Sequence, residues 1–188
     1  MLKVLFQHLP KSLARALTHA SLARFERRYD YDLGYVRELF ELSPQAFLQF
    51  SEFFGLSAFA QDLPPEMLFA AKFAATRHED CGACSQLMLD MAQEAGVPTP
   101  LLNALIAEDA AAMSPPMRLA WRYAQAALAR DSIALATLRA EVTQLHGPRA
   151  MASLALAVVV ARSFPAMKHA LGVGHSCARL SLKPEPTQ

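Results

Sequence analysis

The chain carries almost no net charge. Its eighteen lysine and arginine residues stand against seventeen aspartate and glutamate residues, which leaves +1 with histidine neutral. Proteins that bind nucleic acid or acidic substrates usually show a clear excess of basic residues, so we expect neither kind of partner.

Long apolar runs are also absent. The longest, Met151 to Ala161, has 11 residues and lies between Arg149 and Arg162. A membrane-spanning helix needs about 20 such residues. We therefore expect this run to form a core helix and expect no contact with a membrane.

Strand-like alternation, internal repeats and glycine-rich phosphate loops are missing as well. Most of the twelve prolines stand where a helix is expected to begin. This pattern predicts a single all-α domain of about eight or nine helices joined by short turns. At 188 residues the chain is long enough to bury a core without cross-links.

Cysteine is scarce, with three residues and only one close pair. An odd number with one pair is not the disulfide framework of a small secreted protein, so we expect a cytoplasmic protein. Residues 1–25 are basic and contain no acidic residue, which alone resembles a targeting presequence. The charged-then-apolar layout of a secretory signal does not follow, and we favour a folded N-terminal segment.

The close pair, Cys81 and Cys84, begins a helical pattern. Asp80 is a suitable N-cap and Gly96 a suitable residue after the last turn, so the helix is predicted from about Cys81 to Ala95. Its buried stripe is expected to contain Cys84, Leu87, Met88, Met91 and Ala92, and its polar face Ser85, Asp90, Gln93 and Glu94.

This position favours redox chemistry. The first turn of a helix has unpaired N–H groups and the positive end of the helix dipole, and both stabilise a thiolate. Residues at i and i+3 have Cα atoms roughly 5 Å apart, within the range of a disulfide. We expect Cys81 at the tip to meet solvent and Cys84 to be buried.

The other helices are predicted from caps, prolines and apolar spacing. One follows Pro10 with Leu13, Leu17, Ala20 and Leu22 as its apolar stripe and runs out at the solvated residues 26–28. The four phenylalanines between 47 and 54 are expected in the core. A turn at residues 29–32 is expected to lead into a short helix with Tyr35, Val36, Leu39 and Phe40. The remaining helices are expected at about 44–54, 66–78, 98–107, 115–130, 131–146 and 149–163, with a short segment after Pro165.

Several stretches resemble one family. They are Ala71–Thr76, Cys81–Cys84, Glu94–Val97 and Phe164–Gly172, and they are similar to the alkyl hydroperoxidase D and carboxymuconolactone decarboxylase-like superfamily. The resemblance implies an all-α core at about 63–180, with residues 1–62 as a helical extension packed on it. It also implies trimers or hexamers, no cofactor, a small hydroperoxide substrate and a thiol or dithiol protein as reductant.

The family's proton relay is not retained. In the alkyl hydroperoxidase members a histidine four residues after the second cysteine and a glutamate on the preceding helix relay its proton. Here Met88 and Phe69 stand at those positions, and Ala83 stands where the family often has histidine or tyrosine. Glu66 lies one turn before Phe69, on a similar face, and is the candidate replacement. We expect weak peroxidase activity.

Other side chains near the pair offer further candidates. His78 and Glu79 precede the cysteines and are candidate general bases, or simply exposed residues at a helix end. Arg77, Lys168 and His169 are expected to be polar residues of helix ends. An alternative is a zinc site in which His175 and Cys177 join the cysteine pair, although the H-x-C spacing is tighter than usual.

Two functions follow from these features. The first is a thiol-dependent oxidoreductase that reduces peroxides through Cys81 and Cys84. The second is a non-catalytic helical scaffold or a zinc-stabilised binding protein with the same fold. A lactone-type decarboxylase is a distant third, since that branch generally needs no cysteine pair. Because 53% of the residues are hydrophobic, we expect a homo-oligomer that covers the excess apolar helix surface.

If Cys81 and Cys84 form a redox couple, mild oxidation should join them in one intramolecular disulfide and leave Cys177 as a free thiol. The reason is distance, because only the i, i+3 pair is held in bonding range by local geometry. Peptide mapping after thiol alkylation measures this outcome. A bridge from Cys177 to either of the other cysteines would contradict it.

Overall fold

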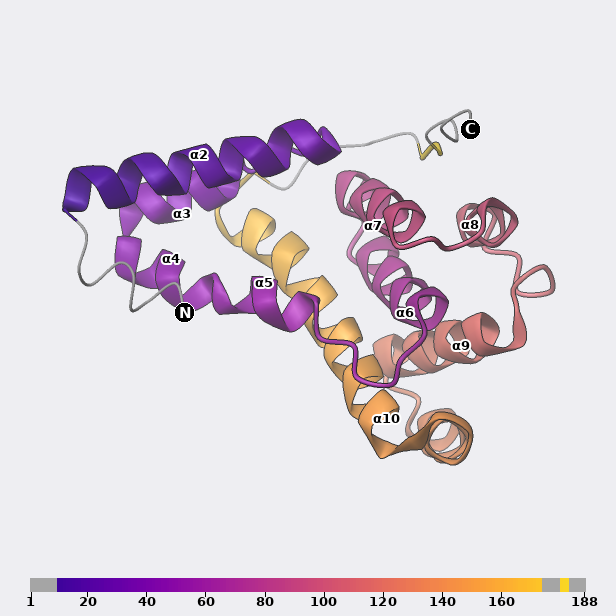
Figure 1. The fold of residues 1–188 in the computed structure, drawn as a ribbon. Coiled ribbons are helices and arrows are strands. Elements are labelled where there is room, and N and C mark those ends of the chain that lie inside the picture. Colours follow the sequence, from indigo (N-terminus) through magenta and orange to yellow (C-terminus); the bar gives the residue numbers. More distant parts are fainter. Residues whose placement is uncertain (1–9, 174–179, 183–188) are drawn as a thin grey trace. The chain divides into compact units, whose positions relative to one another are not determined.

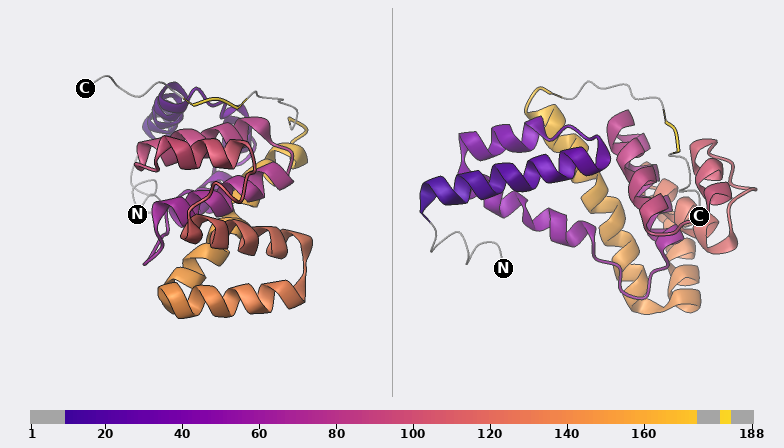
Figure 2. Two further views of the ribbon diagram at one scale, coloured as in Figure 1. Left: turned by 90° about the vertical axis from the view of Figure 1, so that its right-hand side faces the viewer. Right: turned by 45° about the horizontal axis from the view of Figure 1, so that its top comes forward.

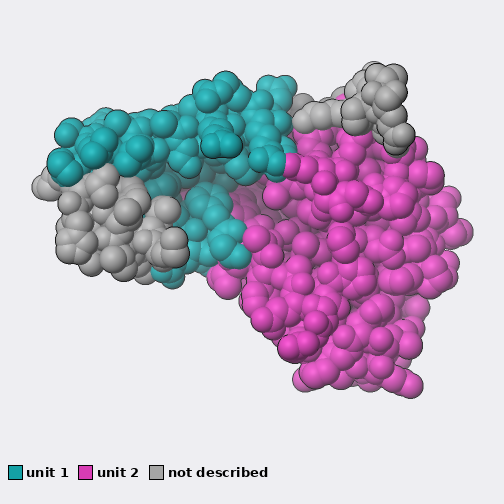
Figure 3. Space-filling model, viewed as in Figure 1, with its two compact units in different colours: residues 1–55 teal, residues 56–188 magenta. Residues whose placement is uncertain are grey.

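The computed structural model describes residues 10–173 and 180–182. Within these ranges the chain forms helices and no strand, which confirms the predicted all-α fold (Figure 1). Two compact units are present, residues 1–55 and 56–188 (Figure 3). Their boundary precedes residue 62, where the N-terminal extension was predicted to end.

The first unit contains four helices in its described part. They are α2 (Lys11–Tyr29), α3 (Gly34–Leu42), α4 (Pro44–Phe50) and α5 (Glu52–Ser57), the last of which crosses the unit boundary. The predicted apolar stripe of α2 was partly wrong, because Leu13 and Leu17 are each 48% exposed. The buried positions are Ala14, Thr18 and Leu22, which follow each other at intervals of four.

The aromatic segment after α3 is only partly in the core, and the prediction that all four phenylalanines are buried was wrong, because Phe54 is 38% exposed. Ser43 is the N-cap of α4, and its hydroxyl accepts a hydrogen bond from the Ala46 N–H at 3.1 Å. Phe47 and Phe50 are buried, and the ring of Phe47 lies edge-on to that of Phe40 with centroids 5.0 Å apart. The predicted single helix over 44–54 is instead divided into α4 and α5 at Ser51.

Glu26 was assigned to a solvated end of α2, and this was wrong. Its carboxylate pairs with Arg37 on α3 and accepts a hydrogen bond from the Leu33 N–H at 3.1 Å. The hydrogen bond from Arg37 holds the pKa of Glu26 below its ordinary value. The charged end of α2 is therefore tied to the start of α3 by an ion pair.

The second unit is built around α6 (Pro65–His78), which packs against α7, α8, α9 and α10 (Figures 1 and 2). The surrounding helices are α7 (Gly82–Glu94), α8 (Thr99–Ile106), α9 (Pro115–Ala129) and α10 (Ser132–Ala170). Every residue of α6 from Met67 to Thr76 is buried. Alanines on this helix let its neighbours approach closely.

The predicted N-caps of α9 and α10 and the predicted glycine after α7 are confirmed. The Ser114 hydroxyl accepts from the Met117 N–H at the start of α9, and the Asp131 carboxylate accepts from the N–H groups of Ile133 and Ala134 at the start of α10. Gly96 has a φ of 81° just after α7, a conformation that a residue with a Cβ atom rarely adopts.

Helix α10 runs further than predicted. Gly147, with φ 86° and ψ 168°, interrupts the helical backbone where a break was expected, but the second part continues through Pro165 to Ala170. Pro165 is fully buried, so packing holds the turn around a residue that lacks an N–H.

By length and composition α10 also meets the test for a membrane span, with a mean hydropathy of 1.7 in its most apolar window. Half of that window is buried inside the protein. Core helices of soluble proteins meet the same test, so this one helix is weak evidence for a membrane.

Candidate functional site

The two cysteines lie at the start of α7 and form a disulfide, with Cα atoms 5.2 Å apart. A tight turn places them there. The Cys81 N–H donates to the Thr76 carbonyl at 3.1 Å, and Asp80 adopts a φ of 51°. The predicted close pair is confirmed.

Cys81, not Asp80, is the N-cap of α7. The Sγ atom of Cys81 accepts a hydrogen bond from the Cys84 N–H at 3.3 Å. Asp80 is used to close the turn, and its left-handed backbone does not suit an N-cap residue, which usually has extended φ and ψ. The Cys81 sulfur therefore lies at the positive end of the helix, in contact with the Cys84 N–H.

The prediction that Cys81 meets solvent was wrong. Cys81 is only 6% exposed and Cys84 only 3% exposed. The hydrogen bond to Thr76 draws Cys81 back onto the end of α6, and the disulfide joins it to the buried stripe of α7. A reductant must therefore reach sulfur atoms that are covered by the protein.

Polar side chains packed beside the disulfide were missed in the sequence. Ser85 is fully buried, and its Oγ atom lies 3.0 Å from Thr76 Oγ1 and 3.1 Å from the Cys81 carbonyl oxygen. Asp90 is also buried, so the predicted polar face was wrong for both residues. A signal was present, because a serine four residues after Cys81 can bond back to its carbonyl.

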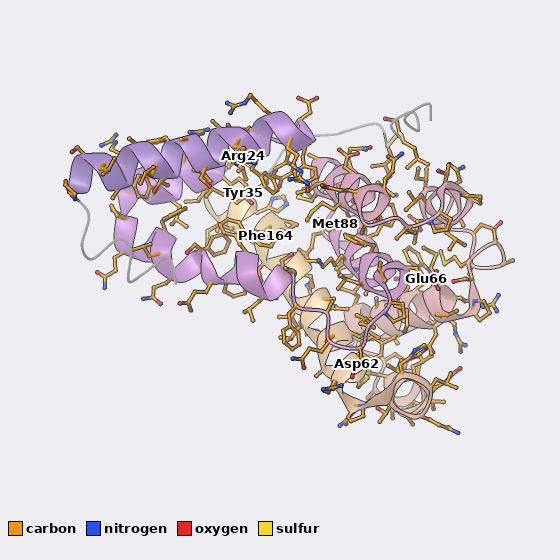
Figure 4. All side chains as sticks on the ribbon, in the orientation of Figure 1. Arg24, Tyr35, Asp62, Glu66, Met88 and Phe164 are labelled. Atoms are coloured by element: carbon orange, nitrogen blue, oxygen red, sulfur yellow. A yellow bond between two sulfur atoms is a disulfide. The ribbon has the colours of Figure 1, made fainter. Side chains whose placement is uncertain are left out.

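The structure does not bring Glu66 to the disulfide. Met88 and Phe69 are both buried. Glu66 lies in the first turn of α6 (Figure 4), and its carboxylate accepts a hydrogen bond from the Ser114 hydroxyl at 2.9 Å. His78 ends the same helix, twelve residues later, which corresponds to about 18 Å of helix rise. Glu66 thus lies at the far end of α6 from the cysteines.

The candidate bases next to the cysteines have different surroundings. His78 is exposed, whereas the half-buried Glu79 carboxylate pairs with Arg162 of α10 at 2.5 Å. Arg77 is exposed and pairs with Glu108 at 3.1 Å. Glu79 and Arg162 border an open groove of about 390 Å³, whose other lining residues are Tyr123, Ala127, Ala155, Val158, Val159, Ser163 and Ala166.

Lys72 is an unexpected buried cation on α6. It is 2% exposed, and its Nζ atom donates to the Ser57 carbonyl and lies 5.2 Å from the centre of the Phe69 ring. Burial lowers the pKa of Lys72 to about 8. In the sequence, Lys72 is the one charged residue in the apolar stretch 67–75, and this position was a signal that its side chain is buried.

A metal site is not evident in the part of the chain that the structure describes, where no group of three or more histidine, cysteine, aspartate or glutamate side chains is arranged to hold an ion. His175 and Cys177, the other two residues of the zinc alternative, lie outside the described residues. That alternative stays a prediction. Of the two residues expected at the polar end of α10, Lys168 is buried and His169 is exposed.

Comparison with known proteins finds no matching family model, no matching curated protein and no matching solved structure. The family resemblance therefore depends only on the short stretches that carry it.

The buried charge of Lys72 should make stability depend on pH. Between about pH 8 and 10.5 the unfolded chain keeps this proton and the folded chain does not, so the cost of burying the charge disappears as the pH rises. Relative to Lys72→Met, wild type should gain about 2 kcal/mol between pH 7 and pH 10. Urea denaturation of both proteins at the two pH values measures this.

Lys72→Gln is the matched control, because it keeps a hydrogen-bond donor for Ser57 without the charge. Its stability difference from wild type should follow the same pH trend. A difference that stays constant from pH 7 to pH 10 for both variants would show that the Lys72 pKa is not lowered in the folded protein.

Proposed function

We propose that this protein is a thiol-dependent oxidoreductase that reduces hydroperoxides through Cys81 and Cys84. The observation that carries the proposal is the pairing of these cysteines in a disulfide at the start of α7. When the pair is reduced, the N-cap position favours a Cys81 thiolate, because the Cys84 N–H and the helix dipole both stabilise negative charge there.

The proposed reaction uses both sulfur atoms. A thiolate of the pair attacks a peroxide oxygen, the O–O bond breaks, and the alcohol leaves after taking up a proton. The resulting sulfenic acid is attacked by the second thiol, which forms the S–S bond and releases water. Two thiols are thereby oxidised to one disulfide, and a thiol or dithiol protein returns two electrons and two protons.

The surroundings of the pair favour a slow reaction. Met88 offers no base, and the Glu79 carboxylate is held by Arg162. General-base assistance typically contributes roughly 10² to 10⁴ in rate. The burial of both sulfur atoms adds a further barrier to the reductant.

The same burial favours a second candidate, a non-catalytic helical scaffold in which the disulfide holds the turn between α6 and α7. In that case Cys81 and Cys84 behave as packed residues. Catalysis separates the two candidates, because only the oxidoreductase consumes a hydroperoxide in proportion to reductant.

We further propose that the protein acts as a homo-oligomer, a trimer or a hexamer. In support, α10 exposes large apolar side chains at Ile133, Leu145 and Val159, which are 83%, 63% and 59% exposed. Light scattering at micromolar concentration should give a multiple of the 20.6 kDa chain mass. A monomer under these conditions would contradict this.

Wild type should reduce tert-butyl hydroperoxide slowly at pH 7 with dithiothreitol as reductant, and faster as the pH rises through the thiol pKa. Cys81→Ser and Cys84→Ser should each abolish turnover. Met88→His places an imidazole one turn after Cys84 and should raise the rate at pH 7 by roughly tenfold or more. Peroxide consumption measured against pH tests these outcomes.

Glu66→Gln is the control, since Glu66 is bonded to Ser114 at the far end of α6. It should leave the rate of the Met88→His protein unchanged. Fast wild-type turnover at pH 7 that is lost in a His78→Ala, Glu79→Gln double variant would assign the base to that pair. No turnover by either wild type or Met88→His would favour the scaffold.

A further inference from the structure

The outer side of α7 holds a second segment of the chain by its backbone. The Gln86 side-chain amide donates from Nε2 to the Ser181 carbonyl oxygen at 2.8 Å and accepts at Oε1 from the Ser181 N–H at 2.9 Å. A single side chain therefore pairs with both main-chain groups of one residue. The amide of Gln86 thus presents to Ser181 one donor and one acceptor, as the main chain of another residue would.

Asp90 fixes the orientation of this amide. Gln86 Nε2 also donates to Asp90 Oδ1, one turn further along α7, at 2.9 Å. A carboxylate only accepts hydrogen bonds, so the amide nitrogen must face Asp90 and the amide oxygen is left for the Ser181 N–H. The donor and acceptor that meet Ser181 are thus set by α7 itself.

The residues around Ser181 alternate in burial. Leu180 and Leu182 are half-buried, whereas Ser181 between them is exposed. The two leucines are therefore partly covered by the protein, while the serine side chain meets solvent. The main chain of Ser181 is held by Gln86, and the leucines on both sides of it are half-buried.

We propose that this face of α7, defined by Gln86 and Asp90, is a docking site for a short peptide segment of a partner protein, held by its main chain as Ser181 is. The partner segment would carry an apolar residue on each side of a small residue, and the chain's own Leu180–Leu182 occupies the site in its absence. The chemistry of the present occupant supports this choice, because it shows what the site accepts.

The main-chain hydrogen bonds and the flanking apolar positions have different roles in peptide binding. The hydrogen bonds from Gln86 involve only the main chain of the central residue. Any residue with an N–H group can therefore bind at this position, and only proline is excluded. The flanking positions select apolar side chains, because only these benefit from burial. An occupant on the same chain competes at a high effective concentration, so a partner binds well only when the tail is displaced. The inference does not depend on the thiol chemistry.

The test uses the full-length chain and a fluorescent peptide with the sequence of residues 180–188. Ser181→Pro removes the N–H that bonds to Gln86 Oε1 and should free the site. Fluorescence anisotropy should then show at least tenfold tighter peptide binding to the Ser181→Pro protein than to wild type. Adding Gln86→Ala to that protein should weaken binding at least tenfold.

Gln93→Ala is the matched control, because Gln93 is another half-buried glutamine two turns further along α7. It should leave peptide binding unchanged. A peptide with proline in place of its serine should not bind the Ser181→Pro protein, and one with alanine in place of both leucines should bind at least tenfold more weakly. These peptide variants test the proposal even where a protein variant fails to fold.

Equal peptide binding by wild type and the Ser181→Pro protein would overturn the proposal, as would binding that is unaffected by Gln86→Ala or by proline in the peptide. A third outcome concerns the identity of the occupant. If Ser181→Pro converts an oligomer into a monomer in light scattering, the site is filled by a second copy of the chain, and the proposal of a separate partner is wrong.

Discussion

The burial of α6 on all sides is the constraint on which the second unit depends. Ten successive residues, 67–76, are buried, so this helix has no face left for solvent and its neighbours must pack around it. The sequence meets this demand with small alanines among a few large side chains, such as Met67 and Phe73, which are fully buried. The one charged exception, Lys72, bonds to the Ser57 carbonyl.

The same constraint shapes the cysteine site. The chain leaves α6 through a turn that is closed by a bond from Cys81 to Thr76, and this bond holds the start of α7 against the end of the central helix. Ser85 and Thr76 complete the contact with their hydroxyl groups. The site therefore combines a helix start, which favours a thiolate, with burial, which restricts access. These two effects act in opposite directions on thiol reactivity.

Much of the fold was predictable because its signals are local. Ser43, Ser114 and Asp131 cap the helices that follow them, and Gly96 adopts the left-handed backbone after α7. Such interactions involve residues within four positions of each other, so they can be recognised in the sequence. Helix α10 is different. It passes through Pro165, because the packing that buries this proline outweighs its tendency to end a helix.

The sequence by itself determined that the chain is helical in its described part and that Cys81 and Cys84 lie within bonding distance, because three residues along a helix start set that distance. Only the tertiary structure decided that both sulfur atoms are buried, that Glu66 bonds to Ser114 away from them, and that Gln86 holds Ser181. These facts depend on residues far apart in the chain, whose contacts follow from the packing of whole helices and leave no periodic signal in the sequence.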